Sequence, residues 1–222
     1  MKHDSIVLII IQCRISSTRL PAKALLPIAG KPSAVLCAMR AGNTGKRVVI
    51  AMPTDKADDP LADILQNENI PYIRGPLEDV LKRFEMAAEK LNDDDIIVRL
   101  TADNLLPDGA FIDEMINMLI DNDYQYVGPT TRLPYGLCGE AMRAKVLREA
   151  AQKATTAEER EHVTPWIRKK YLKLYEPSLL KEDMSNIRCT MDTLEDFIRV
   201  HNAFKNVSDP IQANCWDLMR YF

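Results

Sequence analysis

The stretch that decides the fold is residues 6–32, IVLIIIQCRISSTRLPAKALLPIAGKP. Six consecutive apolar residues, 6–11, open it, and such a run bounded by turn-forming residues is typical of a buried strand in a parallel sheet covered on both faces. A short loop with three cations and three hydroxyls follows: Arg14, Ser16, Ser17, Thr18, Arg19 and Lys23. Open α/β sheets bind phosphorylated ligands just beyond the carboxyl ends of their strands. The stretch therefore predicts a site for a phosphorylated ligand, as in nucleotide-handling enzymes.

Strand-like and helical patterns alternate along the rest of the chain. Further strands are predicted at 47–52, 71–74, 96–100, 124–127 and 187–191. Helical periodicity predicts helices at 31–42, 59–68, 78–91, 109–122, 144–153 and 193–204. Another helix is predicted to begin at Thr155 or Thr156 and to break at Pro165. Strands that alternate with helices of this length favour βαβ units, and hence an α/β fold with a mainly parallel sheet flanked by helices.

Bulk composition bounds the class of protein. The 222 residues fit one large domain, and a net charge of −3 argues against a general nucleic-acid binder. The five cysteines form no CxxC pair and have no histidine beside them, which favours free thiols in a reducing compartment. The apolar run near the N-terminus is too short for a membrane span, and no small-residue cleavage site follows it. We therefore expect a cytoplasmic protein that binds neither nucleic acid nor a membrane.

Two aspartates follow predicted buried strands. Asp103 lies just after the strand at 96–100, and Asp192 follows the one at 187–191. Carboxylates at two strand ends of one sheet can converge on a hard cation such as Mg²⁺ that bridges phosphate oxygens. Two simpler interpretations stay open: Asp103 as a turn residue, and Asp192 as the cap of the helix that follows it.

Five segments in order resemble the sugar-activating cytidylyltransferases: CRISSTRLPAKAL, YIRGPLEDVLKRF, VRLTADNLLPD, REHVTPWIR and RCTMDTLEDF. That family includes the enzymes that make CMP-3-deoxy-octulosonate and CMP-sialic acid, and the chain is most similar to its branch named spore coat polysaccharide biosynthesis protein F. The resemblance implies a Rossmann-like nucleotidyltransferase (glycosyltransferase-A-like) fold. It also implies a single domain over residues 1–222, an acceptor-site and dimerisation insertion at 128–180, and a homodimer.

The resemblance also implies a reaction and the residues that perform it. CMP would pass from CTP to an oxygen of an acidic sugar, a sugar phosphate or a phosphonate, with release of pyrophosphate. Arg19 and Lys23 would hold the triphosphate, with Arg14 nearby, and Asp103 and Asp192 would hold Mg²⁺. Such cations suit the chemistry because negative charge develops on the phosphoryl oxygens and on pyrophosphate in the transition state. Lys23, Arg19 and Asp103 are the predicted catalytic residues.

Other positions are assigned by the same resemblance. Arg74 and Asp79 would lie beside the base and ribose, although an i,i+4 pair between Asp79 and Arg83 would explain both residues without a ligand. Glu140 would orient the acceptor. Arg160 and His162 are candidate acceptor or dimer contacts, and a structural role for them stays open.

The chain departs from the family pattern at four positions. Ser16 and Ala22 stand where glycine is usual, and glycine admits a positive φ and a close approach of backbone N–H groups to phosphate. Asn104 and Cys138 replace residues usual beside the first aspartate and before the acceptor-site acid. These departures keep two alternatives open: transfer from another nucleoside triphosphate such as UTP or GTP, and a non-catalytic nucleotide-binding protein derived from the fold.

Overall fold

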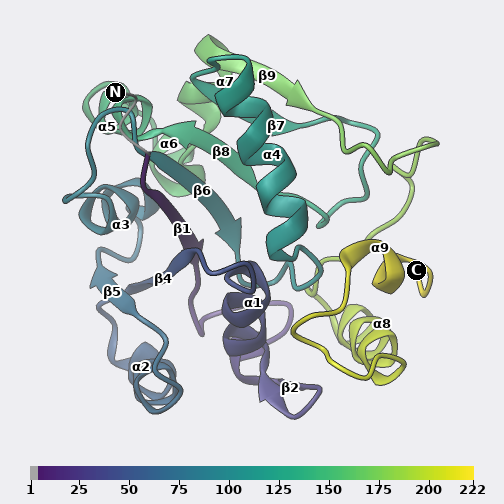
Figure 1. Cartoon of the computed structure of the whole chain (residues 1–222). Helices are drawn as coiled ribbons and strands as arrows, with labels where there is room; N and C mark the ends of the chain where they lie inside the picture. Colours follow the sequence, from purple (N-terminus) through teal and green to yellow (C-terminus); the bar gives the residue numbers. More distant parts are fainter. Residues whose placement is uncertain (1–4) are drawn as a thin grey trace.

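A seven-stranded sheet forms the centre of the computed structural model, which describes residues 5–222 (Figure 1). Its strand order is β5-β4-β1-β6-β8-β7-β9. The strands are β1 (Val7–Gln12), β4 (Arg47–Pro53), β5 (Tyr72–Gly75), β6 (Ile96–Thr101), β7 (Tyr126–Pro129), β8 (Glu140–Arg143) and β9 (Leu172–Tyr175). Only β8 runs antiparallel to its neighbours β6 and β7. A small antiparallel pair, β2 (Pro27–Ile28) and β3 (Lys31–Pro32), lies apart from this sheet.

Helices cover both faces of the sheet (Figure 1). They are α1 (Ser33–Ala41), α2 (Asp59–Asn67), α3 (Val80–Ala87), α4 (Gly109–Asp121), α5 (Ala144–Lys153), α6 (Ala157–His162), α7 (Pro165–Tyr171), α8 (Leu194–Lys205) and α9 (Cys215–Met219). Two short 3₁₀ helices, η1 (Lys23–Leu25) and η2 (Lys56–Asp58), complete the set in the described residues. The mainly parallel, helix-flanked α/β fold predicted from the sequence is confirmed.

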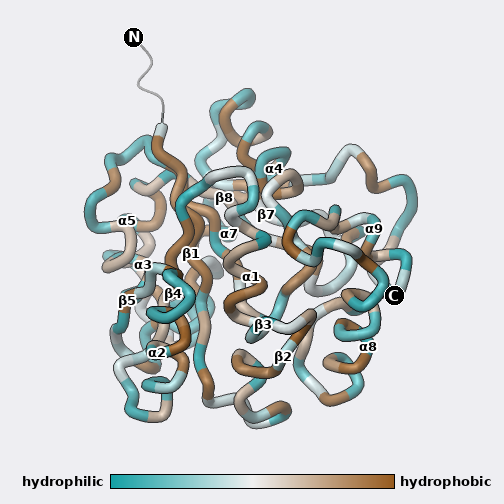
Figure 2. The backbone as a smooth tube through the Cα atoms, turned by 60° about the horizontal axis from the view of Figure 1, so that its bottom comes forward, coloured by the Kyte–Doolittle hydropathy of each residue, from teal (hydrophilic) through white to brown (hydrophobic). Residues whose placement is uncertain are grey.

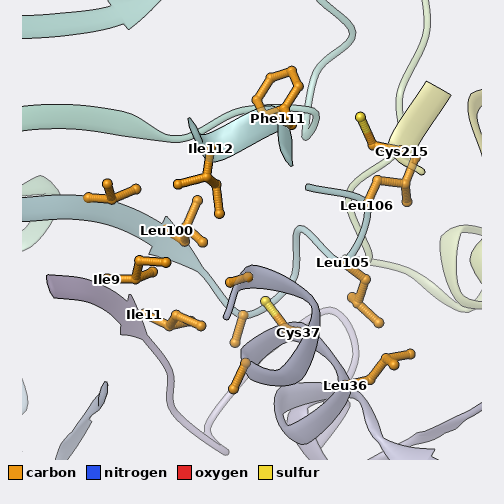
Figure 3. Packing of buried hydrophobic residues seen from close by; sticks show 14 of the residues in the cluster. Ile9, Ile11, Leu36, Cys37, Leu100, Leu105, Leu106, Phe111, Ile112 and Cys215 are labelled. Atoms are coloured by element: carbon orange, nitrogen blue, oxygen red, sulfur yellow. The ribbon is translucent and has the colours of Figure 1, made fainter. Parts of the chain in front are cut away.

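The central strand β1 divides the core into two layers. Ile9 and Ile11 pack with residues of α1, α4, α8 and α9, whereas Leu8 and Ile10 pack with residues of α3, α5 and α7. Successive side chains of a strand point to opposite faces, so one apolar run supplies both layers. Figure 2 shows this run as a continuous hydrophobic stretch, and Figure 3 shows Ile9 and Ile11 on the side of α1 that carries Cys37, with Leu100 of β6 and Ile112 of α4 above them.

Most elements of the main sheet and its helices occur where the sequence predicts them, and the exceptions among the main-sheet strands lie in the second half. The short pair β2 and β3 was not predicted either, and β3 occupies the first two residues of the helix predicted at 31–42. Residues 187–191 do not form a strand: the segment makes one isolated bridge, Tyr135 to Arg188. The prediction of a strand there was wrong. A strand needs a run of successive pairs with a neighbouring strand, and in the described residues this segment makes one pair only. Strands β8 and β9 were not predicted, and both lie within residues 128–180. That segment therefore contributes strands to the main sheet.

The predicted helix break at Pro165 is confirmed, because α6 ends at His162 and α7 begins at Pro165. Thr156 caps α6 in a capping box with Glu159, as one of the two predicted starts requires. Within residues 5–222, no helix is long and apolar enough to cross a membrane. The prediction that no secretion signal is present falls partly on residues 1–4, which lie outside the described residues.

Candidate functional site

A cavity of about 1140 Å³ opens at the carboxyl ends of β1 and β6. Its walls come from the loop after β1, the segment after β6, residues 129–140 and the α6–α7 junction. Ten of the sequence-predicted site residues line it: Arg14, Ser16, Ser17, Thr18, Arg19, Lys23, Asp103, Glu140, His162 and Asp192. Parallel strands bring their carboxyl ends to one edge of a sheet, which is why residues far apart in sequence meet there.

The loop after β1 is held in a compact shape by its own backbone and by one buried acid. Asp58 accepts a hydrogen bond from the Ile15 N–H at 2.7 Å, and the Ala22 N–H donates to the Ile15 carbonyl at 3.2 Å. Ala22 has φ +56°, the left-handed conformation for which glycine is favoured, so the family's glycine at this position has a backbone reason. Ser16 has no positive φ. Serine at that position therefore causes no backbone strain.

Lys23 joins the two predicted metal-binding aspartates. Its ammonium donates to Asp103 Oδ2 at 2.6 Å and to Asp192 Oδ1 at 2.7 Å. Burial alone would lower the pKa of Lys23, but the two carboxylates, Asp103 first, raise it above its usual value. The carboxylates thus converge on one cation, as expected for groups that can share a charged ligand.

Asp192 is the most heavily paired acid of the site. Besides Lys23, it accepts from Arg188 Nη2 at 2.6 Å and lies 3.0 Å from Arg19 Nη2. Burial by itself would raise the pKa of Asp192, but the hydrogen bond and charge of Lys23, together with the arginines, hold it below its usual range. The cap of α8 is Thr193 rather than Asp192. The simpler interpretation of Asp192 as a helix cap is therefore wrong.

Backbone pairing places Asp192 beside Asp103 without a strand. The Met191 N–H donates to the Asp103 carbonyl at 2.9 Å, and Asp196 accepts from the N–H groups of Asp192 and Thr193 at 3.0 Å each. These bonds fix the end of the 187–191 segment against the end of β6. Asp103 is consequently part of a charged cluster, and the interpretation as a plain turn residue does not describe it.

Glu140 lies at the opposite wall in a saturated hydrogen-bond network. It is 5% exposed and accepts from Arg99 Nη1 at 2.6 Å, from the Tyr126 hydroxyl and from the Thr164 hydroxyl at 2.9 Å. Arg168 lies 3.8 Å away. Because both carboxylate oxygens are already engaged, Glu140 is suited to hold Arg99 and Thr164 in place rather than to accept a proton directly.

Cys138, a half-buried residue next to this wall, lines the cavity. Its Sγ donates to the Gly139 carbonyl at 2.7 Å, and burial raises its pKa well above the usual value. Thiol nucleophiles act as thiolates, so this cysteine is not an activated nucleophile. All five cysteines of the chain, each within the described residues, are free thiols.

Three predicted site residues do not line the cavity. Arg74 donates to the Pro53 carbonyl and pairs with Asp59 at 2.7 Å. Asp79 caps α3 by accepting from the Lys82 N–H, and its carboxylate pairs with Arg160 at 2.5 Å. Arg74, Asp79 and Arg160 are thus engaged with other side chains or with backbone and are not part of the cavity wall. Their assignment to the base, the ribose and the acceptor stays a prediction.

Four cavity arginines were not singled out as site residues: Arg83, Arg99, Arg168 and Arg188 line the cavity or pair with its acids. A signal for Arg99 was present, because a charge inside the buried run IIVRLT must have a polar partner. The i,i+4 pair of Asp79 with Arg83, which the sequence left open as an alternative, does not form: Arg83 donates instead to the Pro76 and Leu77 carbonyls.

Known proteins are similar to this chain in sequence and in fold. The family model described as cytidylyltransferase matches residues 8–208. An uncharacterised protein of Methanocaldococcus jannaschii is 33% identical over 85% of this chain and 79% of its own length. The spore coat polysaccharide biosynthesis protein SpsF of Bacillus subtilis is 30% identical over 96% of this chain and 92% of its own.

A solved structure agrees with these matches. The structure of a cytidylyltransferase from Leptospira borgpetersenii superposes with a TM-score of 0.88 and 26% identity, covering 97% of this chain and 93% of that one. The fold, the family model and the relatives point to the same assignment. The chain belongs to the cytidylyltransferase family.

Proposed function

We propose that this protein transfers CMP from CTP to an oxygen of an acidic sugar, sugar phosphate or phosphonate, with release of pyrophosphate, in surface-glycan or related biosynthesis. One observation carries the proposal. The carboxylates of Asp103 and Asp192 each lie within 2.7 Å of the Lys23 ammonium, in a large cavity that Arg19 also lines. The relative of Bacillus subtilis, named for spore coat polysaccharide biosynthesis, supports a sugar-related acceptor.

The cations of the loop after β1 perform the electrostatic part of the reaction. Arg19 is largely exposed and offers a planar guanidinium, whereas Lys23 is mostly buried and offers a compact charge. Held near the triphosphate, they stabilise the charge that builds on the phosphoryl oxygens and on the departing pyrophosphate. Since no covalent intermediate is needed, positioning and charge neutralisation supply most of the acceleration.

The donor set suits Mg²⁺. Asp103 and Asp192 offer hard carboxylate oxygens that both reach one nitrogen, so these oxygens can be no further apart than the sum of the two hydrogen-bond distances. Among the described residues no third acid, histidine or cysteine joins them. Mg²⁺ is commonly held by one or two carboxylates plus substrate phosphates and waters. When bound, it would supply charge neutralisation to the phosphate oxygens.

The acceptor would lie against the wall made by Glu140 and its partners. Arg99 and Arg168 line this wall, as does His162, and the Arg168 side chain is 45% exposed. Glu140 accepts a hydrogen bond from Arg99 and lies 3.8 Å from Arg168, so it holds two positively charged groups at this wall of the cavity. An anionic acceptor follows from that charge, because guanidinium groups pair strongly with carboxylate and phosphate.

A pyrophosphate-release screen tests the proposal. CTP and Mg²⁺ are combined with acidic sugars, sugar phosphates and phosphonates, and one acceptor class is expected to release pyrophosphate. Asp103→Asn should abolish that release, whereas Asp121→Asn, at the exposed end of α4, should keep it. Full activity of Asp103→Asn would contradict the metal assignment. Nucleotide binding without pyrophosphate release across the whole panel would support the non-catalytic alternative.

Two further parts of the proposal concern the assembly and its location. We infer a homodimer that acts in the cytoplasm, on the strength of the family membership and the free thiols. Light scattering of the purified protein tests the first, and cell fractionation tests the second. A strictly monomeric protein across a wide concentration range would overturn the dimer.

A further inference from the structure

The turn between α6 and α7 has a backbone conformation that its central residue disfavours. Val163 has φ +69° and ψ −51°, and the Thr164 N–H donates to the His162 carbonyl at 2.7 Å. A hydrogen bond that spans one central residue with such angles defines the γ-turn of positive φ, which is rare and strained. A positive φ is especially unfavourable for a β-branched residue such as valine. The turn therefore stores strain at a single residue.

Thr164 also departs from its local preference. A residue before proline favours an extended backbone, whereas Thr164, which precedes Pro165, has φ −101° and ψ −8°. In this conformation the Thr164 carbonyl accepts from the Arg168 N–H at 2.8 Å and begins the hydrogen bonding of α7. Since local preference favours neither conformation, contacts with the rest of the fold must hold the turn.

Two kinds of contact hold the turn. The Val163 side chain is fully buried in the core layer that contains Leu147 and Ile167. The Thr164 hydroxyl lies 2.9 Å and 3.2 Å from the two carboxylate oxygens of Glu140, on β8. A hydrogen bond to a charged group contributes more to stability than one between neutral groups. Strained backbone persists only where its surroundings determine it in this way.

The strained turn lies at the cavity. His162, Thr164 and Arg168 line the cavity, and Arg168 lies 3.8 Å from Glu140. The turn sets the direction in which α7 leaves α6, and hence the position of Arg168 relative to His162. Relaxation of Val163 to a negative φ would change that direction. Backbone strain is concentrated at functional sites, where a fixed placement of side chains outweighs its cost in stability.

We propose that Val163 and Thr164 are positioning residues, whose strained turn is held by the hydrogen bond between Thr164 and Glu140 and fixes the acceptor wall of the cavity. This inference deepens the proposed function and rests on it for the identity of the bound group. Glu140 then acts through Thr164 and need not contact the acceptor. Loss of the hydrogen bond lets the turn relax, whereas the cluster around Lys23 on the opposite wall keeps its own contacts.

The first test measures the turn without a ligand. Thr164→Val removes the hydroxyl and keeps the shape of the side chain, and Thr155→Val, at an exposed threonine just before α6, is the matched control. Amide hydrogen exchange at residues 162–168 is expected to be faster by on the order of tenfold or more in Thr164→Val, as the loss of one hydrogen bond to a charged group allows. Thr155→Val should leave the exchange unchanged.

Helix α4, which packs on the other face of the sheet, is the internal reference for this test. Unchanged exchange at residues 162–168 in Thr164→Val would overturn the inference. An acceleration of equal size in α4 would also overturn it, because that result would mean a global loss of stability and no local opening of the turn.

The second test separates positioning from a merely structural role. With an acceptor that releases pyrophosphate in the screen, Thr164→Val is expected to raise the KM for that acceptor on the order of tenfold, because a displaced wall binds it less well. Titration calorimetry with CTP and Mg²⁺ alone should give an unchanged affinity. Thr164→Ser, which keeps the hydroxyl, should restore both the KM and the slow exchange.

An unchanged acceptor KM in Thr164→Val, or a parallel loss of CTP affinity, would overturn the positioning role. Failure of the unaltered protein to release pyrophosphate with any acceptor would contradict the proposed function itself. The exchange experiment would still decide whether the hydrogen bond between Thr164 and Glu140 holds the turn.

Discussion

The ammonium of Lys23 donates a hydrogen bond to the carboxylate of Asp103 at 2.6 Å, across 80 residues of sequence. This bond ties the loop after β1 to the end of the neighbouring strand β6. The same nitrogen reaches Asp192, so one cation neutralises two carboxylates that would otherwise repel each other. The free protein thus holds the two acids together with its own side chain.

Removal of this cation should separate its two roles. Lys23→Gln is expected to lower turnover by about a hundredfold or more, because one fixed donor to a developing oxyanion is worth that much. The same change should leave Mg²⁺ binding to the free protein as tight or tighter, since the ammonium no longer competes for the oxygens of Asp103 and Asp192. Calorimetry with Mg²⁺ and steady-state pyrophosphate release measure the two effects.

A control for this prediction is Lys31→Gln, which removes a cation paired at 3.4 Å with Glu68, a residue that does not line the cavity. That variant should keep both properties. Weaker Mg²⁺ binding in Lys23→Gln would contradict the competition between lysine and metal.

The network around Glu140 should be sensitive to loss of its charge. Glu140→Gln leaves Arg99 buried without its ionic partner, and breaking a buried pair on one side costs about 3–5 kcal/mol. Urea unfolding followed by circular dichroism measures the change. Glu149→Gln, at a surface pair with Lys170, should alter the free energy of unfolding by less than about 1 kcal/mol. Equal effects in the two variants would contradict a structural role for Glu140.

The cap of α6 predicts a dependence of stability on pH. Hydrogen bonds from the Thr155 and Thr156 N–H groups hold the pKa of Glu159 below its usual value. A lowered pKa in the folded state means that the ionised group stabilises the fold above the unfolded value of about 4.3. This contribution is lost as pH falls through the folded-state pKa.

Urea midpoints at pH 7 and near pH 3 measure that contribution. Glu159→Gln should lower the midpoint at pH 7, and its difference from the unaltered protein should shrink in acid. Glu158→Gln, at the preceding position of the same helix, should show no such convergence. A Glu159→Gln deficit that stays constant with pH would contradict this interpretation.

Ala22 predicts a substitution that stabilises the protein. Its φ of +56° is unfavourable for a residue with a Cβ atom, so Ala22→Gly should raise the free energy of unfolding by about 0.5–1 kcal/mol. Ala87→Gly, within α3, should have the opposite sign and cost about 1 kcal/mol. Equilibrium unfolding in urea measures both. A destabilising Ala22→Gly would mean that chain entropy outweighs the relief of strain.

Most of the secondary structure was predictable because its signals are local. The apolar run of β1, the periodicity of α4 and the capping residues of α6 each lie within one stretch of about a dozen residues. Strands β8 and β9 were not predictable in this way: they are four residues each, β8 follows a stretch rich in turn-forming residues, and β9 follows α7 directly. Their conformation depends on pairing with β6 and β7, which no local pattern records.

The candidate site was likewise predictable only in part. The chain's residues alone located the cationic loop and Asp103, since charge after a buried strand is a local signal. Asp192 was singled out as well, although the strand predicted before it does not form. They could not show that Asp79 pairs with Arg160, 81 residues away, instead of with Arg83 on its own helix. A long side chain can reach many neighbours, and only packing selects among them.

The sequence pattern was thus sufficient to predict the mainly parallel sheet, its flanking helices and the edge of the sheet at which a phosphorylated ligand would bind. The meeting of Lys23 with Asp192, 169 residues apart, was decided by the tertiary structure. So was the burial of Arg83, whose Nη1 donates to the Pro76 and Leu77 carbonyls. The physical reason is that periodicity encodes which face of an element is buried, whereas the partner of a buried charge is set by whichever distant segment folds against it.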